Sequence, residues 1–157
     1  MQKVQSVIDI GTGAGFPGIP LKIAFPHLKV VLLDSLNKRI KFLEAVIEEL
    51  GLENISTIHG RAEDFAKKKE YREQFDLCVS RAVANLSTLS EYCLPFVAVN
   101  GSFVSYKSGD SEEEKNVDKF QLPGTDMGRA LVEIKKTKQT PGKYPRKAGL
   151  PAKEPLK

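Results

Sequence analysis

The chain has 157 residues, of which 41% are hydrophobic and 28% are charged, and its formal net charge is +4. This length and composition fit one globular domain with a substantial core. No apolar run approaches the roughly 18 residues of a membrane span, and two cysteines are too few for a disulfide framework or a zinc cluster. We therefore expect a cytoplasmic protein that has no metal centre and does not enter a membrane.

The first two thirds of the chain alternate between strand-like and helix-like segments. Strands are predicted at residues 4–10, 29–34, 55–60, 75–82 and 101–109. Helices are predicted at residues 18–25, 36–52 and 85–97. Several of the strands are apolar throughout, which is typical of a parallel sheet covered by helices on both faces. The predicted fold class is therefore α/β, with a doubly wound, mostly parallel sheet.

The last third of the chain carries fewer signals. Residues 110–129 are rich in charge and have no apolar periodicity. Residues 130–138 predict one more strand, at a sheet edge because lysines alternate along it. Residues 137–157 form a basic C-terminal segment containing the stretch KYPRKAG. This segment is either a solvated, disordered tail or a surface for a polyanion.

The stretch DIGTGAGFPG, residues 9–18, places four glycines directly after the first strand. Such a turn lies at the carboxyl edge of the sheet, where doubly wound folds bind ligands. A P-loop is excluded because no Gly-Lys-Ser/Thr ending follows, and Lys22 lies too far along the chain. The nicotinamide fingerprint Gly-x-Gly-x-x-Gly fails at its third glycine, where Phe16 stands. Pro17 and Pro20 also remove backbone donors that a pyrophosphate would use.

The pattern that fits is Asp-x-Gly-x-Gly-x-Gly, formed by Asp9, Gly11, Gly13 and Gly15. We interpret it as a site for S-adenosylmethionine (SAM), which needs close backbone approach without an anion cradle. Asp9 would favour the cationic groups of SAM. Asp34 ends the second strand, where an acid commonly accepts hydrogen bonds from ribose hydroxyls. NAD sites share that acid, so Asp34 alone does not separate the two cofactors.

Two further loops are expected at the same edge. In HGRAEDF, after the third strand, spacing alone favours a capped helix in which Glu63 and Asp64 serve the helix dipole. Arg81 lies just past the fourth strand and is interpreted as a ligand for the SAM carboxylate or a substrate phosphate. The alternative is that Arg81 pairs with Asp76 or Glu63 and only holds loops together.

The loop SRAVANL, residues 80–86, limits the methyl acceptor. It lacks the Asn/Asp-Pro-Pro-Tyr/Phe element of enzymes that methylate exocyclic amines. Cys78 lies inside an apolar strand, whereas pyrimidine-carbon methylation needs a cysteine nucleophile in this loop. What remains is an acceptor that needs neither covalent activation nor a strong base, and guanine N7 is one. No side chain is assigned as catalytic.

Five stretches together resemble the bacterial RsmG family, also called glucose-inhibited division protein B: DIGTGAGFPGIPL, LLDSLNKRIKFL, HGRAEDF, FDLCVSRAVANL and GSFVSYKSG. Members of that family are small-subunit ribosomal RNA guanine-N7 methyltransferases. The resemblance implies a Rossmann-like class I SAM-dependent methyltransferase domain over residues 1–136, in which residues 110–129 are shortened relative to the family. It also implies 16S ribosomal RNA or the small ribosomal subunit as partner.

The resemblance implies roles for single residues as well. Gly11 and Phe16 would line the SAM pocket with the Ala62-Glu63 pair, and Arg81 would contact SAM or the reacting centre. Lys107 and the KYPRK segment become candidates for contact with the RNA backbone. The residues predicted to bind SAM are Gly11, Gly13, Gly15, Phe16, Asp34, Ala62, Glu63 and Arg81.

Two other functions fit the sequence less well. One is a SAM-dependent methyltransferase of a small molecule or a protein, for which the basic C-terminal segment would be dispensable. The other is a non-catalytic SAM-binding domain that docks on RNA. We expect a monomer in each case.

Overall fold

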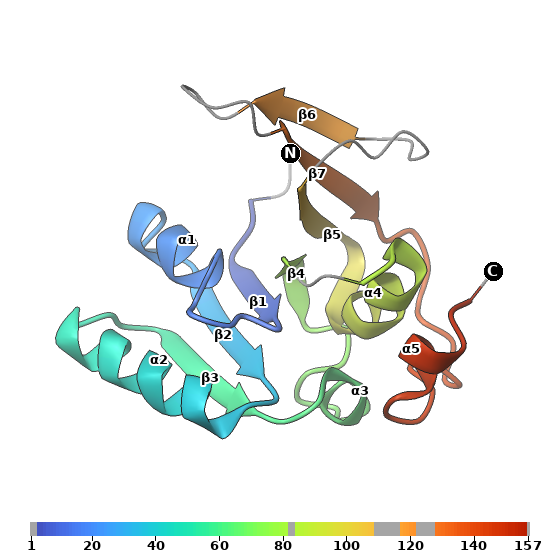
Figure 1. Cartoon of the computed structure of the whole chain (residues 1–157), viewed down its shortest axis with the longest axis horizontal. Coiled ribbons are helices and arrows are strands. Elements are labelled where there is room, and N and C mark those ends of the chain that lie inside the picture. Colours follow the sequence, from blue (N-terminus) through green and yellow to red (C-terminus); the bar gives the residue numbers. More distant parts are fainter. Residues whose placement is uncertain (1–2, 82–83, 109–116, 122–127, 157) are drawn as a thin grey trace.

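The computed structural model of the chain describes residues 3–81, 84–108, 117–121 and 128–156 (Figure 1). One seven-stranded sheet has the order β3-β2-β1-β4-β5-β7-β6. The strands are β1 (Ser6–Ile10), β2 (Lys29–Asp34), β3 (Ile55–His59), β4 (Phe75–Ser80), β5 (Val97–Ser108), β6 (Val117–Gln121) and β7 (Gly128–Lys135). The helices are α1 (Gly18–Ala24), α2 (Asn37–Glu49), α3 (Ala62–Phe65), α4 (Leu86–Cys93), the 3-10 helix η1 (Leu94–Phe96) and α5 (Leu150–Lys153).

The order of the first five strands places a switch point between β1 and β4. The chain builds β1, β2 and β3 in one direction and then returns to add β4 and β5 on the other side of β1. All neighbouring pairs among these strands are parallel. Their carboxyl ends therefore meet at one edge, and the loops that follow β1 and β4 leave the sheet there, at the position where doubly wound folds bind ligands.

Each face of the sheet has its own apolar core. Val7 of β1 packs with Ile19 of α1 and Leu43 of α2 on one face. Ile8 of β1 packs with Leu89 of α4 on the other face. Figure 1 shows α1 and α2 on one side of β1 and β2, with α4 and α5 on the opposite side. The sequence prediction of a doubly wound, mostly parallel α/β fold is confirmed.

The predicted strand at residues 130–138 is present as β7, but the prediction that it lies at a sheet edge is wrong. β7 lies between β5 and β6 and is antiparallel to both. The lysines do not mark a solvent edge, since Lys136, directly after β7, is buried and its ammonium donates to the carbonyls of Leu94 and Val97. On this side of the sheet the edge strand is β6, which lies within residues 110–129, where the sequence showed no periodic signal. Residues 109–116 and 122–127 lie outside the described residues.

The basic C-terminal segment is not a solvated tail. Residues 137–156, which we call the strap, lie along α4 and the connection after α3. Arg72 of that connection donates to the carbonyl oxygens of Thr140, Pro141 and Tyr144. Thr88 of α4 donates from Oγ1 to the carbonyl of Pro151 in α5 at 3.1 Å.

No helix in the described part of the chain combines the length and the apolar character that a membrane span needs.

Candidate functional site

The glycine loop that follows β1 turns through left-handed backbone. Gly11, Gly13 and Gly15 have φ angles of +66°, +61° and +94°, which side chains with a Cβ rarely adopt. A Cβ added at Gly13 would meet no atom within 4 Å, so this part of the loop faces open space. The loop therefore presents bare backbone at the carboxyl edge of the sheet.

Most backbone N–H groups of this loop are already used inside the protein. Gly11 and Thr12 both donate to the carbonyl of Leu33, at 2.9 and 3.1 Å. Gly15 and Phe16 both donate to the carbonyl of Thr12. A loop that cradles phosphate aims its N–H groups outward at the anion. In this loop the N–H groups donate to carbonyls of the protein instead, so a ligand would meet backbone atoms without a ring of free donors.

The start of α1 is equally poor in free donors. Pro17 and Pro20 have no N–H group, and the N–H of Ile19 donates to the carbonyl of Gly15 at 2.7 Å. Lys22 is buried and its ammonium turns away from the ligand edge, because it donates to the carbonyls of Pro26 and Leu28 in the connection after α1. The turn and the start of α1 therefore offer few free N–H donors for a phosphate, which agrees with the sequence arguments against a P-loop and a pyrophosphate site.

Gly18 performs the close-packing role that the nicotinamide fingerprint gives to its third glycine. A Cβ on Gly18 would overlap Leu32 of β2 and would lie 2.9 Å from the Asp9 carboxylate. The helix approaches the sheet at Gly18, two positions after Phe16, because the loop is longer. Gly18 is the last of the four glycines, and no sequence pattern indicated its role.

Asp9 is completely buried at the base of the site. Its Oδ2 accepts hydrogen bonds from Thr12 Oγ1 at 2.7 Å and from the N–H of Gly18 at 2.9 Å. Its Oδ1 is buried without a hydrogen-bond partner among the described residues. Burial raises the pKa of the Asp9 carboxyl to about 7, although these two hydrogen bonds and the charge of Arg81 lower it.

Asp34 joins the glycine loop to the loops after β2 and β3. Its Oδ2 accepts from the N–H of Gly13 at 2.9 Å, and its backbone carbonyl accepts from the N–H of Gly60 at 3.0 Å. Oδ1 accepts from the N–H of Leu36, and Arg39 lies 3.4 Å from Oδ2. The Asp34 carboxylate thus fixes the backbone of the glycine loop and of the loop after β2. Asp34 is also the residue that the sequence predicts to bind the ribose.

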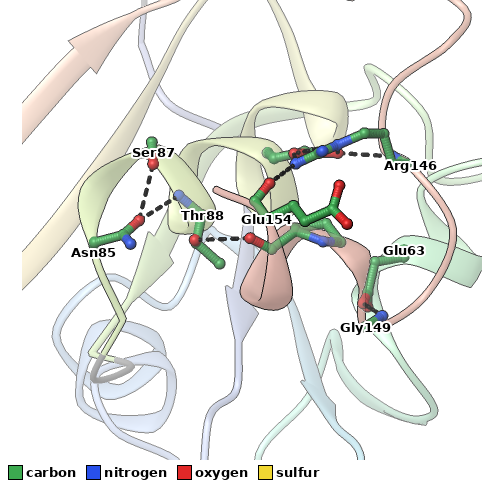
Figure 2. Close-up of polar contacts among 9 residues, drawn as sticks. Glu63, Asn85, Ser87, Thr88, Arg146, Gly149 and Glu154 are labelled. Carbon is green, nitrogen blue, oxygen red and sulfur yellow. Dashed lines mark hydrogen bonds and ion pairs between the residues drawn. The ribbon is translucent and has the colours of Figure 1, made fainter. Parts of the chain in front are cut away.

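The predicted Ala62-Glu63 pair opens α3 and is buried. The Oε1 atom of Glu63 accepts from the N–H of Gly149 at 3.0 Å, a contact between residues 86 positions apart (Figure 2). Gly149 is in the left-handed region, with φ +83°, at the start of α5. The carboxylate of Glu63 therefore holds the strap beside a predicted cofactor loop, which no local sequence pattern indicated.

Arg81 and Phe16 bring together the loops after β4 and β1. The guanidinium carbon of Arg81 lies 5.5 Å from the centroid of the Phe16 ring, and that ring is 46% exposed. The carboxylates offered as alternative partners of Arg81 bind elsewhere: Asp76 accepts from the N–H groups of Gln5 and Ser6, and Glu63 accepts from Gly149.

A second buried carboxylate anchors the strap on α4. Glu91 accepts from the N–H, Nε and Nη2 of Arg146, with distances between 2.8 and 3.2 Å (Figure 2). Burial alone would raise the pKa of the Glu91 carboxyl, but Arg146 outweighs it and lowers that pKa below its ordinary value. Lys107, the other predicted RNA contact, lies in β5 opposite Ala130 of β7.

Solved structures of other proteins share this fold. The chain superimposes on the S-adenosylmethionine-dependent methyltransferase SibL with a TM-score of 0.67 at 15% identity, over 87% of this chain and 51% of that one. A putative transferase from Pyrococcus horikoshii gives a TM-score of 0.65 at 14% identity, over 83% of this chain and 56% of that one. At these identities the likeness concerns the fold alone.

Sequence comparison identifies the family. The small-subunit methyltransferase G of Desulforamulus reducens is 55% identical over 96% of this chain and 69% of its own length. The protein of the same name from Clostridium tetani is 51% identical over 99% of this chain and 72% of its own length. The profile of the GidB family, described as rRNA small subunit methyltransferase G, matches residues 1–140. The chain therefore belongs to the GidB family of small-subunit rRNA methyltransferases.

Proposed function

We propose that this chain transfers the methyl group of SAM to N7 of a guanine in 16S ribosomal RNA, and that the loops at the carboxyl edge of β1 to β4 hold the cofactor. As a member of its family the chain is a SAM-dependent methyltransferase. The observation that carries the proposed site is the glycine loop, which exposes open backbone at Gly13 beside Asp34 and Arg81.

The polar groups of the site fit SAM. The Oδ1 atom of Asp9 is buried and lacks a partner among the described residues, and a nearby cation would stabilise its ionised form. SAM carries two such cations, the sulfonium and the amino group. A nucleotide would bring phosphates instead, and the N–H groups of Gly11, Thr12 and Gly15 are directed to carbonyls of the protein. The site therefore suits a cationic ligand better than an anionic one.

We assign the remaining predicted contacts by position. The backbone of Gly11, Gly15 and Phe16 shapes the pocket wall. Asp34 accepts from the ribose hydroxyls. Ala62 and Glu63 contact the adenosine of SAM, and Arg81 binds its carboxylate. Because Arg81 lies over Phe16, its guanidinium is oriented before a ligand arrives.

Guanine N7 suits a site without an assigned general base. Bound SAM supplies an activated methyl group; the N7 lone pair forms the new N–C bond, and the methyl–sulfur bond breaks with its electron pair on sulfur. No proton moves, since N7 carries none. The protein then accelerates the reaction by orienting the two reactants and by excluding water.

The partner and the division of the chain follow from the same proposal. Residues 1–136 form the methyltransferase domain, and residues 137–157 form the basic segment that faces RNA. A guanine in a loop or in a partly assembled subunit is a better substrate than one in a duplex, because the enzyme must reach its base edge. We infer that the protein works as a cytoplasmic monomer.

Calorimetric titration with S-adenosylhomocysteine, with NAD in a parallel titration, tests the site. We expect micromolar binding of S-adenosylhomocysteine, no binding of NAD, and loss of binding in Asp34→Ala. Asp76→Ala is the matched control, because Asp76 also accepts from backbone N–H groups but does so beside Gln5 and Ser6, at the amino edge. Binding of NAD alone, or equal loss in both variants, would refute the assignment.

Transfer to RNA is tested with labelled SAM and 16S transcripts or small subunits as acceptors. Mapping of the product by cleavage at N7-methylguanine distinguishes this proposal from amine methylation. Methylation of another position, or of no RNA, would contradict the acceptor while leaving the cofactor site standing.

A further inference from the structure

We propose that Glu63 couples the cofactor site to the strap, so that SAM and RNA each strengthen the binding of the other. The inference rests on the proposed function, since it takes the loop of Ala62 and Glu63 as an adenosine contact and the strap as an RNA contact. What it adds is a physical connection between the two sites and a residue that carries it.

A continuous path of hydrogen bonds leads from the glycine loop to the loop after β3. The N–H of Gly13 donates to the carboxylate of Asp34, and the carbonyl of Asp34 accepts from the N–H of Gly60. Gly60 also lies directly against Phe65 of α3, because a Cβ added there would overlap the Phe65 ring. The two predicted cofactor loops are therefore linked to each other through Asp34.

Glu63 extends this path to the strap. Its side chain is 4% exposed, and Oε1 accepts from the N–H of Gly149 at 3.0 Å. The backbone of Glu63 belongs to the cofactor loop and its carboxylate belongs to the strap contact (Figure 2). Any ligand that orders the backbone at Ala62 and Glu63 also holds this carboxylate in place for Gly149.

The strap presents lysines for RNA while its arginine is used for anchoring. Lys143, Lys147 and Lys153 are exposed, whereas Arg146 is bound by the buried carboxylate of Glu91. Lysines on a segment that is already ordered bind phosphates at a lower entropy cost than lysines on a free tail. Ordering of the strap and affinity for RNA should therefore change together.

Coupling of this kind is reciprocal. If occupancy of the cofactor site orders the strap, then RNA bound to the strap must raise cofactor affinity by the same factor. We expect RNA affinity to rise by about fivefold or more when the cofactor site is filled. The physical basis is the chain of contacts through Asp34 and Glu63, which both ligands would favour over an arrangement in which Gly149 has left Glu63.

Hydrogen exchange of the unmodified protein is the first test, because it needs no variant. S-adenosylhomocysteine should slow amide exchange in the glycine loop and also across residues 145–153 of the strap. β7, in the interior of the sheet, serves as the internal control. Slowed exchange in the glycine loop alone would overturn the inference and leave the proposed cofactor site intact. Absence of S-adenosylhomocysteine binding would overturn both.

Variants then test whether the coupling runs through Glu63. Affinity for a 16S transcript is measured with and without saturating S-adenosylhomocysteine, and the ratio of the two affinities is the readout. Glu63→Ala should reduce the ratio to about one, whereas Glu63→Gln, which keeps an acceptor for Gly149, should preserve most of it. A ratio in Glu63→Ala equal to that of the wild type would overturn the inference.

Glu91→Ala is the matched control for a loosened strap. It removes the partner of Arg146 on α4 but leaves Glu63 and Gly149 in place. RNA affinity should then fall equally with and without S-adenosylhomocysteine, so the ratio stays at the wild-type value. Loss of the ratio in both Glu63→Ala and Glu91→Ala would mean that strap order in general carries the effect, and would refute the specific role of Glu63.

Discussion

The guanidinium of Arg81 lies over the exposed ring of Phe16, with its central carbon 5.5 Å from the ring centroid. This contact joins the loop after β1 to the loop after β4, the two loops that diverge at the switch point of the sheet. Phe16 is the residue that breaks the nicotinamide fingerprint. In the structure it supports the arginine that we assign to the SAM carboxylate.

Replacement of Arg81 should weaken cofactor binding. Arg81→Ala removes a charged hydrogen-bond donor worth about 1.5–3 kcal/mol, so S-adenosylhomocysteine affinity should fall by about tenfold or more. Arg81→Lys keeps the charge but loses the planar guanidinium and its stacking geometry. Its affinity for S-adenosylhomocysteine should lie between those of the wild type and Arg81→Ala. Calorimetric titration measures the change. Unchanged affinity in Arg81→Ala would show that Arg81 does not contact the cofactor.

Gly18→Ala should destabilise the protein. The new methyl group would overlap Leu32 and crowd the Asp9 carboxylate, so α1 must move away from the sheet. Overpacking of this kind costs about 1–3 kcal/mol in the free energy of unfolding. Urea denaturation measures it, with Gly142→Ala as the control because a Cβ there meets no atom within 4 Å. Equal stability of the two variants would refute the close-packing role.

Stability should fall as the pH rises through the range in which Asp9 ionises. Burial raises the pKa of Asp9 from 3.8 to about 7, so the folded chain retains a proton that the unfolded chain has released. Between about pH 4 and pH 7 the folded state therefore binds more protons, and the free energy of unfolding decreases by at most about 1.4 kcal/mol per pH unit.

The Asp9→Asn variant isolates this effect. Its amide oxygen can still accept from Thr12 and Gly18, but it does not titrate. Urea denaturation across the same pH range should show a flatter profile for Asp9→Asn than for the wild type. Parallel profiles would mean that Asp9 ionises at an ordinary pKa in the folded protein.

Loss of the Glu91 carboxylate should release part of the strap. Glu91 has a side chain only 1% exposed and binds Arg146 through three of its donors. Glu91→Ala removes charged hydrogen bonds of about 1.5–3 kcal/mol, which corresponds to roughly tenfold faster trypsin cleavage after Lys143 or Lys147. Glu53→Ala, an exposed acid next to β3, is the control. Identical digestion rates would indicate that the strap is held by its other contacts.

Much of the fold and the cofactor loop could be predicted from the sequence because the signals are local. An apolar run such as KVVLLD has to be buried on both faces, and the glycines after Ile10 occupy left-handed backbone that other residues rarely adopt. The proline positions at the start of α1 likewise exclude a phosphate site without reference to any distant residue. These features depend on a few consecutive residues, and the structure reproduces them.

Tertiary structure alone decided what lies beside the site. The contact between Glu63 and Gly149 spans 86 positions, and the buried charge of Lys136 is stabilised by the Glu73 carboxylate and by carbonyls from η1 and β5. A basic stretch has the same composition whether it is solvated or packed against the domain. The charge pattern therefore could not predict that the strap packs on α4 and on the connection after α3. Its position is set by buried carboxylates that need donors, because an unpaired buried charge is costly and the strap supplies the missing partners.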